Sequence, residues 1–282
     1  MHKRFSGVVV PMITPLNKDY TIDVAAVQRI VTLFAENAIH PLVLGTTGES
    51  SSISEKESLK LVEVAVKSKG TKQCIYAGLV GNQVDDLILR GNRYISLGAD
   101  CVVATLPSYY GLTSNQMIAF YKTLADNIKG PVMMYNIKAT TQMTIPLDVV
   151  ETLSVHPNIW GLKDSERDFE RMEACIKKYK NEKAFSYFCG WGAQSASSLK
   201  LGADGIVPST GNYVPEMYKE LYDAALNSDW NACEKWQQET DLVAQQYQKD
   251  KTLGESLAVL KALMHEKNIC NKTMMPPLTE VE

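Results

Sequence analysis

Eight short apolar segments recur along this chain, and their spacing constrains the fold more than any other feature. Each segment is followed by turn residues and then by a stretch with helical character. The segments are almost continuously apolar rather than alternating, which is typical of strands buried on both faces of a sheet. Their spacing of roughly 20 to 35 residues is the length of one strand-plus-helix unit. They begin at Gly7, Pro41, Cys74, Ala99, Pro131, Ile159, Ala184 and Asp204.

The stretches between the apolar segments have helix-capping signals. One of them, SEKESLKLVEVAVKSKG, begins with Ser54 and Glu57 at capping-box spacing and ends at Gly70, and two further stretches also close on a glycine. The joint helix-Gly-Ala-Asp-strand occurs twice, as SLGADCVV and KLGADGIV. Repeated units of this kind predict a parallel sheet. Eight units fit a closed barrel better than an open doubly wound sheet, and no GxGxxG motif follows the first segment.

The strand-like segments stop after about Tyr222. Residues 223–282 have few β-branched runs, which favours helices, and no Pro/Ser-rich linker precedes them. We therefore predict an α/β protein with two parts. Residues 1–222 form a catalytic (β/α)₈ TIM barrel, and residues 223–282 form a C-terminal helical extension packed on it.

The composition excludes several classes of function. Of the 282 residues, 45% are hydrophobic and 22% are charged, and the net charge is -3, as in ordinary soluble proteins. There is no basic stripe, so we expect no nucleic-acid partner, and no apolar run of about 18 residues, so we expect no membrane span. The apolar run near the N-terminus is too short for a signal peptide. We therefore expect a cytoplasmic protein.

The six cysteines and four histidines do not form a metal-binding pattern. The cysteines are scattered without a CxxC motif, and the histidines show no HxH or HExxH spacing. His40 and His156 each precede a proline near an apparent element boundary, so we interpret both as structural. We expect reduced cysteines, no metal and no cofactor.

Lys163 is the least expected residue in the apolar segments. It ends the stretch NIWGLK, whose other residues suit a buried strand, although lysine is almost never fully buried without compensation. One interpretation is a lysine that ends its strand in solvent. The other is a nucleophile, because exclusion of water disfavours the ammonium form and the free amine can attack a ketone to form an imine.

Other polar residues follow the predicted strands, where the active site of a (β/α)₈ barrel lies. Tyr135 ends the strand before that of Lys163, so its phenol is predicted either to approach the amine and move protons or only to pack at the rim. The turn GTTGE offers the hydroxyls of Thr46 and Thr47 and glycine-flanked backbone N–H groups for a carboxylate. Glu49 is interpreted as a helix-capping residue.

Four motifs follow one another in the chain: GTTGE, YYG, YN and GLKDS. In this order and spacing they resemble the dihydrodipicolinate synthase / N-acetylneuraminate lyase family of pyruvate-dependent class I aldolases, over residues from about Phe5 to Tyr222. The resemblance implies an enzyme, a lyase without metal or cofactor. It also implies a (β/α)₈ barrel with C-terminal helices and a homotetramer built as a dimer of dimers.

The resemblance assigns roles to individual residues by position. Lys163 resembles the lysine that forms the Schiff base, and Tyr135 resembles the general acid/base beside it. Thr46 and Thr47 resemble the pair that binds the carboxylate of pyruvate, and Thr47 also relays protons. Tyr110 resembles the tyrosine that reaches into the proton relay of the neighbouring subunit.

Five further residues are expected to bind the substrate. Val207 aligns with the residue whose backbone faces the keto acid, and Gly45 and Gly190 lie in turns after strands. Lys138 replaces a proline frequent in the family and is expected to contact an acidic or hydroxylated part of the substrate. Thr140 stands where dihydrodipicolinate synthases usually have an arginine for the carboxylate of their second substrate, which weakens that interpretation.

The leading hypothesis is therefore a Schiff-base aldolase that cleaves a 2-keto-3-deoxy sugar acid, or a similar 2-keto acid, to pyruvate and an aldehyde. The motif GNYVPE favours this substrate class, and the loop GWGAQ lacks the acidic residues usual in sialic acid lyases. The alternatives on the same imine are a dehydratase of a 2-keto-3-deoxy acid, an N-acetylneuraminate lyase and a 4-hydroxy-tetrahydrodipicolinate synthase. A non-catalytic keto-acid binding protein is the alternative from another class.

Overall fold

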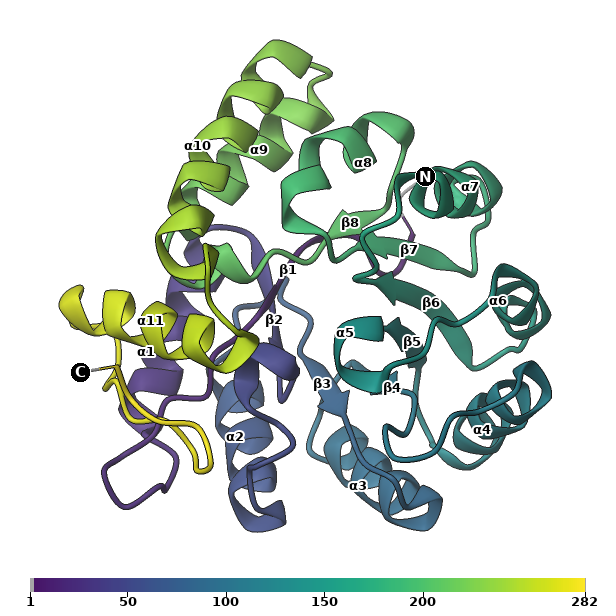
Figure 1. Ribbon diagram of the computed structural model, residues 1–282, viewed down its shortest axis with the longest axis horizontal. Coiled ribbons are helices and arrows are strands. Elements are labelled where there is room, and N and C mark those ends of the chain that lie inside the picture. Colours follow the sequence, from purple (N-terminus) through teal and green to yellow (C-terminus); the bar gives the residue numbers. More distant parts are fainter. Residues whose placement is uncertain (1–2, 282) are drawn as a thin grey trace.

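The computed structural model describes residues 3–281, and its centre is a closed barrel of eight parallel strands (Figure 1). The strands neighbour one another in chain order, and the last one closes the barrel by pairing with the first. The predicted (β/α)₈ barrel is therefore confirmed. The strands are β1 (Gly7–Pro11), β2 (Ile39–Val43), β3 (Tyr76–Leu79), β4 (Cys101–Thr105), β5 (Val132–Asn136), β6 (Ile159–Asp164), β7 (Ser186–Cys189) and β8 (Gly205–Ile206).

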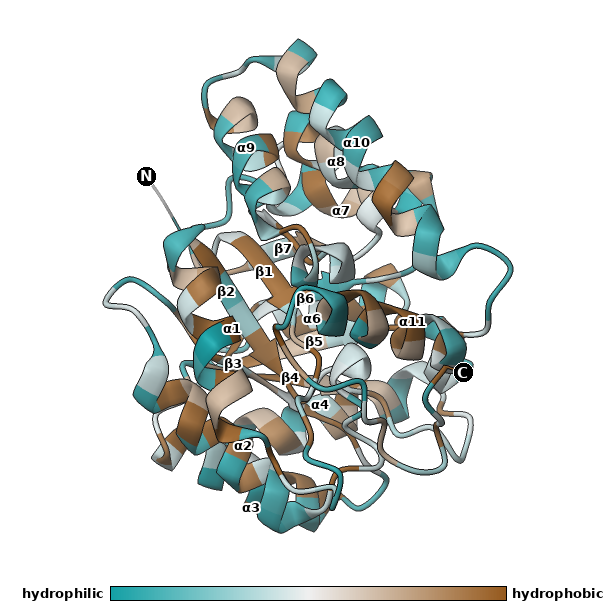
Figure 2. Ribbon diagram, turned by 90° about the vertical axis from the view of Figure 1, so that its left-hand side faces the viewer, coloured by the Kyte–Doolittle hydropathy of each residue, from teal (hydrophilic) through white to brown (hydrophobic). Residues whose placement is uncertain are grey.

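Helices surround the barrel and connect successive strands. Apolar side chains on the outer faces of the strands pack against these helices, and a second apolar cluster fills the barrel interior. The ribbons of the strands are largely brown, the colour of hydrophobic residues, in Figure 2. Burial on both faces explains why the strand segments are continuously apolar. The helices are α1 (Val24–Glu36), α2 (Glu55–Ser68), α3 (Val84–Ser96), α4 (Ser114–Asn127), α5 (Lys138–Thr141), α6 (Leu147–Ser154), α7 (Phe169–Tyr179) and α8 (Ser195–Leu201).

The repeated Gly-Ala-Asp joint ends two helices and begins two strands. Gly98 and Gly202 adopt φ angles of +103° and +104°, a left-handed conformation that glycine adopts without steric cost. The following Asp100 and Asp204 each accept a hydrogen bond of 2.8 Å from a backbone N–H at the neighbouring strand. Each joint therefore stops a helix and fixes the start of a strand to its neighbour.

The helix predicted from Ser54 to Gly70 is confirmed, but its caps are only partly as predicted. The Ser54 side chain accepts the backbone N–H of Glu57 and caps α2. The Glu57 carboxylate does not complete a capping box, because it accepts the N–H of Ile22 at 2.9 Å instead. The helix ends with Lys69 in an extended conformation, so the prediction of a terminal glycine cap is wrong.

In the described residues after β8, a short 3-10 helix η3 (Ser209–Asn212) is followed by α9 (Pro215–Leu226), α10 (Trp230–Gln248) and α11 (Leu253–Glu266). The boundary predicted at residue 222 falls inside α9. The Tyr247 hydroxyl joins α10 to the barrel, because it hydrogen-bonds with the hydroxyls of Ser209 and Thr210 at 2.8 and 2.9 Å. Among the described residues, no helix is long and apolar enough to cross a membrane.

Candidate active site

Lys163 and Tyr135 lie side by side at the carboxyl ends of β6 and β5. They are partners in the strand register, as are Asp164 and Asn136, and because side chains alternate along a strand the two pairs point to opposite faces of the sheet. The Lys163 Nζ lies 3.6 Å from the centre of the Tyr135 ring. Since Lys163 is only 3% exposed, its interpretation as a solvated surface lysine is wrong.

The surroundings of Tyr135 favour its phenolate. Burial alone raises the pKa of the phenol, and the positive charge of Lys163 opposes that effect. The Thr46 hydroxyl hydrogen-bonds with the phenol oxygen, and the Ser165 hydroxyl also stabilises the phenolate, so the pKa of Tyr135 lies below its usual value. The Thr46 Oγ1 lies 3.5 Å from this oxygen. A phenol with a lowered pKa beside a buried amine can accept and return a proton.

Ser165 is a site residue that the sequence prediction missed. It lies two positions after Lys163, so strand alternation directs it to the same face, and this spacing was the available signal. Gly190, after β7, makes room for it, because a Cβ on Gly190 would lie 2.2 Å from the Ser165 Oγ. Gly190 was predicted to bind the substrate, and its lack of a side chain accommodates the serine.

We expect Ser165→Ala to move the pH dependence of turnover to higher pH. The serine hydroxyl lowers the pKa of Tyr135, so its removal raises that pKa and leaves less phenolate near neutral pH. Turnover near neutral pH should fall by about threefold to tenfold, the effect of one hydrogen bond, and recover as the pH rises. A profile of kcat against pH measures the shift. An inflection at the same pH as in the parent enzyme would contradict an action of Ser165 on Tyr135.

The turn GTTGE follows β2 and contains the short 3-10 helix η1 (Thr46–Gly48). Two backbone hydrogen bonds close the turn, the first of them to the Gly45 carbonyl at 3.0 Å. Thr46 reaches the phenol oxygen of Tyr135, and Thr47 is buried next to it in the turn. The structure thus brings the predicted carboxylate-binding turn to the same end of the barrel as the predicted acid/base.

Glu49 takes a different position from the one predicted. Its carboxylate does not cap a helix but lies 2.5 Å from the Nζ of Lys261 in α11. The second carboxylate oxygen accepts the backbone N–H of Met275 at 2.7 Å. The partners are far apart in the sequence, so no local pattern indicates this pair.

Val207 and Tyr110 were both predicted to be site residues, but Val207 is buried and Tyr110 is exposed. Val207 follows β8 and is buried in the inner cluster together with Tyr135. Tyr110 lies on the loop after β4, is 74% exposed in the single chain, and packs against the ring of Tyr109 with the ring centres 4.9 Å apart. The structure of one chain therefore places Val207, but not Tyr110, in the same buried cluster as Tyr135.

A cavity of about 450 Å³ opens beside the turn at the carboxyl ends of the strands. Lys138 begins α5 near the same rim, with its side chain 62% exposed and its Nζ 3.8 Å from the Glu166 carboxylate. A larger groove of about 600 Å³ runs along α2 and α3 and contains none of the predicted site residues. The cavity of about 450 Å³ beside the turn is lined by several hydroxyl side chains, which include those of Thr46, Ser50, Thr105, Ser108, Thr140 and Thr141.

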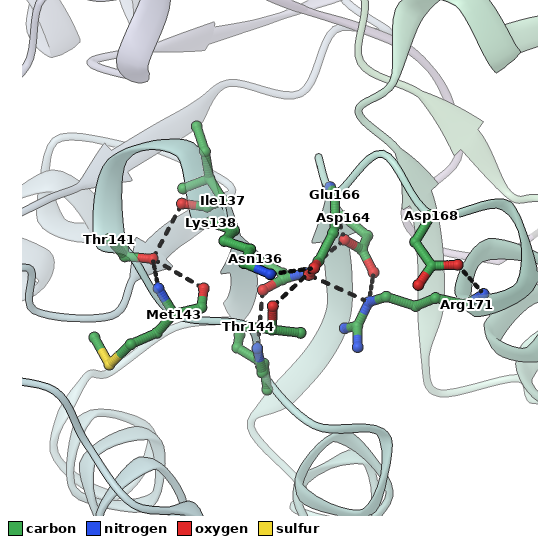
Figure 3. Close-up of polar contacts among 11 residues, drawn as sticks. Asn136, Ile137, Lys138, Thr141, Met143, Thr144, Asp164, Glu166, Asp168 and Arg171 are labelled. Carbon is green, nitrogen blue, oxygen red and sulfur yellow. Dashed lines mark hydrogen bonds and ion pairs between the residues drawn. The ribbon is translucent and has the colours of Figure 1, made fainter.

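A polar network behind the two strand ends fixes the loop that carries α5 (Figure 3). The Asn136 amide donates to Asp164 at 2.8 Å and to Glu166 at 2.9 Å. Arg171 of α7 donates to the other oxygen of Asp164 at 2.7 Å, and Thr144 donates to Glu166 at 2.7 Å. Burial raises the pKa of Asp164 although the guanidinium opposes it. The network joins β5, β6, α7 and the loop, and it holds the neighbouring tyrosine and lysine in register.

The histidines and cysteines make structural contacts. The His40 ring accepts the backbone N–H of Cys74 at 3.1 Å, and the His156 ring hydrogen-bonds with Asp126 at 3.0 Å. All six cysteines are free thiols. Within residues 3–281, no three His, Cys, Asp or Glu side chains form a group that could hold a metal ion.

Known proteins resemble this chain over nearly its whole length. A family model described as the dihydrodipicolinate synthetase family matches residues 4–282. The 4-hydroxy-tetrahydrodipicolinate synthase of Staphylococcus saprophyticus is 29% identical over 285 residues, which cover 99% of this chain and 92% of that protein. The corresponding protein of Staphylococcus epidermidis is 30% identical over 228 residues, covering 80% and 77%. The solved dihydrodipicolinate synthase of Bacteroides thetaiotaomicron has a TM-score of 0.93 and 26% identity, covering 100% of this chain and 95% of that one.

Proposed function

The chain belongs to the dihydrodipicolinate synthetase family of pyruvate-dependent class I aldolases, and on this premise we propose that it cleaves a 2-keto-3-deoxy sugar acid to pyruvate and an aldehyde. The observation that carries the proposal is the contact of the buried Lys163 amine with the Tyr135 ring at 3.6 Å. An amine excluded from water beside a proton-transferring phenol is the arrangement that imine chemistry requires.

The proposed reaction begins when the Lys163 amine attacks the C2 ketone, and loss of water gives a protonated imine. The Tyr135 phenolate then takes the proton of the C4 hydroxyl. The electron pair of the C3–C4 bond moves into the imine, which leaves an enamine and releases the aldehyde. The enamine takes up a proton at C3, and water hydrolyses the imine to pyruvate and the free amine.

The keto acid is proposed to bind through its carboxylate at the turn GTTGE. Thr46 supplies a hydroxyl 3.5 Å from the Tyr135 oxygen, so a carboxylate held there places C2 near the amine. Thr47 is proposed to complete this contact and to relay protons. Gly45 begins the turn, and the backbone of Val207 is proposed to face the keto acid from the end of β8.

The part of the substrate beyond C4 is proposed to lie in the hydroxyl-lined cavity beside α5. Hydroxyl groups both donate and accept hydrogen bonds, so this lining suits a hydroxylated tail. Thr140 contributes to the lining, and the exposed Lys138 adds a positive charge at the rim for an acidic end of the tail.

A second candidate function is that of a 4-hydroxy-tetrahydrodipicolinate synthase, because the relatives from both Staphylococcus species carry that name. This reaction uses the same imine but joins pyruvate to a second substrate that carries a carboxylate. Thr140, where an arginine is usual, argues against it. A dehydratase of 2-keto-3-deoxy acids and an N-acetylneuraminate lyase share the imine as well, and a non-catalytic binding protein would lack it.

A substrate panel separates these candidates. We expect the purified chain to release pyruvate fastest from a 2-keto-3-deoxy sugar acid, because its hydroxyls match the cavity lining. The panel contains several such acids, N-acetylneuraminate, and pyruvate with aspartate semialdehyde, and pyruvate is measured with a coupled dehydrogenase. Consumption of pyruvate with aspartate semialdehyde would identify a synthase, and a dehydrated keto acid without an aldehyde product would identify a dehydratase.

We further propose a cytoplasmic homotetramer built as a dimer of dimers, with no membrane or nucleic-acid partner. The exposed aromatic rings of Tyr109 and Tyr110 support this proposal, since aromatic side chains are enriched in interfaces between subunits. Across such an interface Tyr110 would join the proton relay of the neighbouring site. Light scattering after size-exclusion chromatography measures the assembly.

A further inference from the structure

The ion pair between Glu49 and Lys261 is fully buried and has no part in the proposed chemistry. The side chains are 0% and 1% exposed. The Lys261 Nζ also donates to the Thr273 carbonyl at 2.7 Å. Burial lowers the pKa of Lys261, and the Glu49 carboxylate opposes this effect. Because removing two charges from water is unfavourable, a buried pair of this kind is weak evidence for stability.

The turn that ends at Glu49 has an unusual backbone at both of its ends. Leu44 and Glu49 both adopt φ angles of +56°, the left-handed region that non-glycine residues rarely enter. Such conformations persist only where the surroundings hold them. Thr46 and Thr47 lie between these two residues. A contact that fixes Glu49 therefore also fixes the direction of the two hydroxyls.

The C-terminal extension supplies that contact from two separate elements. Lys261 comes from α11, and the segment after this helix supplies the Thr273 carbonyl to the ammonium and the Met275 N–H to the carboxylate. Figure 1 shows α11 on the same side of the barrel as α1 and β2. Arg29 of α1 holds the segment there by donating to the Ile269 carbonyl at 3.1 Å.

We infer that the Lys261–Glu49 ion pair positions the carboxylate-binding turn, so that the C-terminal extension sets the affinity of the site for pyruvate. This inference rests on the proposed function. Both members of the pair are positioning residues, because they act through the turn that carries Thr46 and Thr47. The nucleophile Lys163 lies on β6 and keeps its contact with Tyr135, so imine formation at saturating pyruvate should be retained.

Borohydride trapping at increasing pyruvate concentrations tests this inference, with the adduct quantified by intact mass. Lys261→Met should raise the pyruvate concentration that gives half-maximal adduct by about tenfold or more, the effect of losing well-placed hydrogen bonds to a carboxylate. The maximal adduct should stay the same, since Lys163 and Tyr135 are intact. If Lys261→Met leaves the pyruvate concentration for half-maximal adduct unchanged, the inference is overturned but the proposed function is not. A parent enzyme without any adduct would overturn the proposed function.

Two further variants separate positioning from stability. Leu260→Ala removes a fully buried side chain from the same helix without touching the pair, so it should lower the melting temperature but leave the half-saturation unchanged. An equal rise in half-saturation with Leu260→Ala would overturn the inference. The double variant Glu49→Gln with Lys261→Met leaves no unpaired buried charge and should fold even if the single variant does not. The double variant should still need the higher pyruvate concentration for half-maximal adduct. A return of that concentration to the parent value would also overturn the inference.

Discussion

Lys163→Ala is expected to abolish the covalent adduct with pyruvate and to lower kcat/KM by on the order of 10⁴-fold or more, because covalent catalysis is lost entirely. The residues paired with Lys163 on the adjacent strands are Tyr135 and Phe188. Neither has an amine that could replace the nucleophile. The measurement is intact mass after borohydride reduction with pyruvate, together with the rate of pyruvate release from the best substrate of the panel.

Lys138→Ala is the matched control for this prediction. Lys138 begins α5, whose Thr140 and Thr141 line the cavity, but its side chain is 62% exposed and its Nζ lies 3.8 Å from the Glu166 carboxylate. Its removal should leave the adduct with pyruvate unchanged, because its exposed side chain is not held against Tyr135 as that of Lys163 is. An adduct that persists in Lys163→Ala and disappears in Lys138→Ala would reverse the assignment of the nucleophile.

The barrel was predictable because each of its units carries its own signals. The apolar runs, the helix caps and the two Gly-Ala-Asp joints are local patterns, and the structure places a strand at every predicted segment. The strand ends were predictable for the same reason, since parallel strands in chain order bring Tyr135 and Lys163 together. The burial of Lys163 suggested a nucleophile, and the resemblance of the four motifs to a protein family favoured this role and that of Tyr135 as acid/base.

Long-range contacts were not predictable from the sequence. Glu57 has the spacing of a capping box, but the loop before α1 offers it a different donor, the N–H of Ile22. Glu49 follows a glycine and precedes serines, so local patterns favour a cap, whereas its partner Lys261 comes from the last helix. Ser165 becomes important only when the neighbouring strand places Gly190 opposite to it. In each case tertiary packing decides between partners that the sequence leaves equivalent.

Tyr135→Phe is expected to separate imine formation from bond cleavage. The phenylalanine ring retains the packing beneath the Lys163 amine, so the adduct with pyruvate should still form during long incubation. The phenol oxygen is lost, so kcat for cleavage should fall by about 10²- to 10⁴-fold, the usual contribution of a general acid/base. Single-turnover kinetics and borohydride trapping measure the two steps separately.

The pH dependence provides a second readout for the same variant. Because the charge of Lys163 and the neighbouring hydroxyls hold the pKa of Tyr135 below its usual value, the phenolate forms, and turnover of the parent enzyme rises, as the pH passes through that lowered value. Tyr135→Phe should lose this inflection, whereas Ser165→Ala should keep it and move it to higher pH. If Tyr135→Phe retains both the parent kcat and the inflection, the proton is moved by another group, and Thr47 in the neighbouring turn is the next residue to replace.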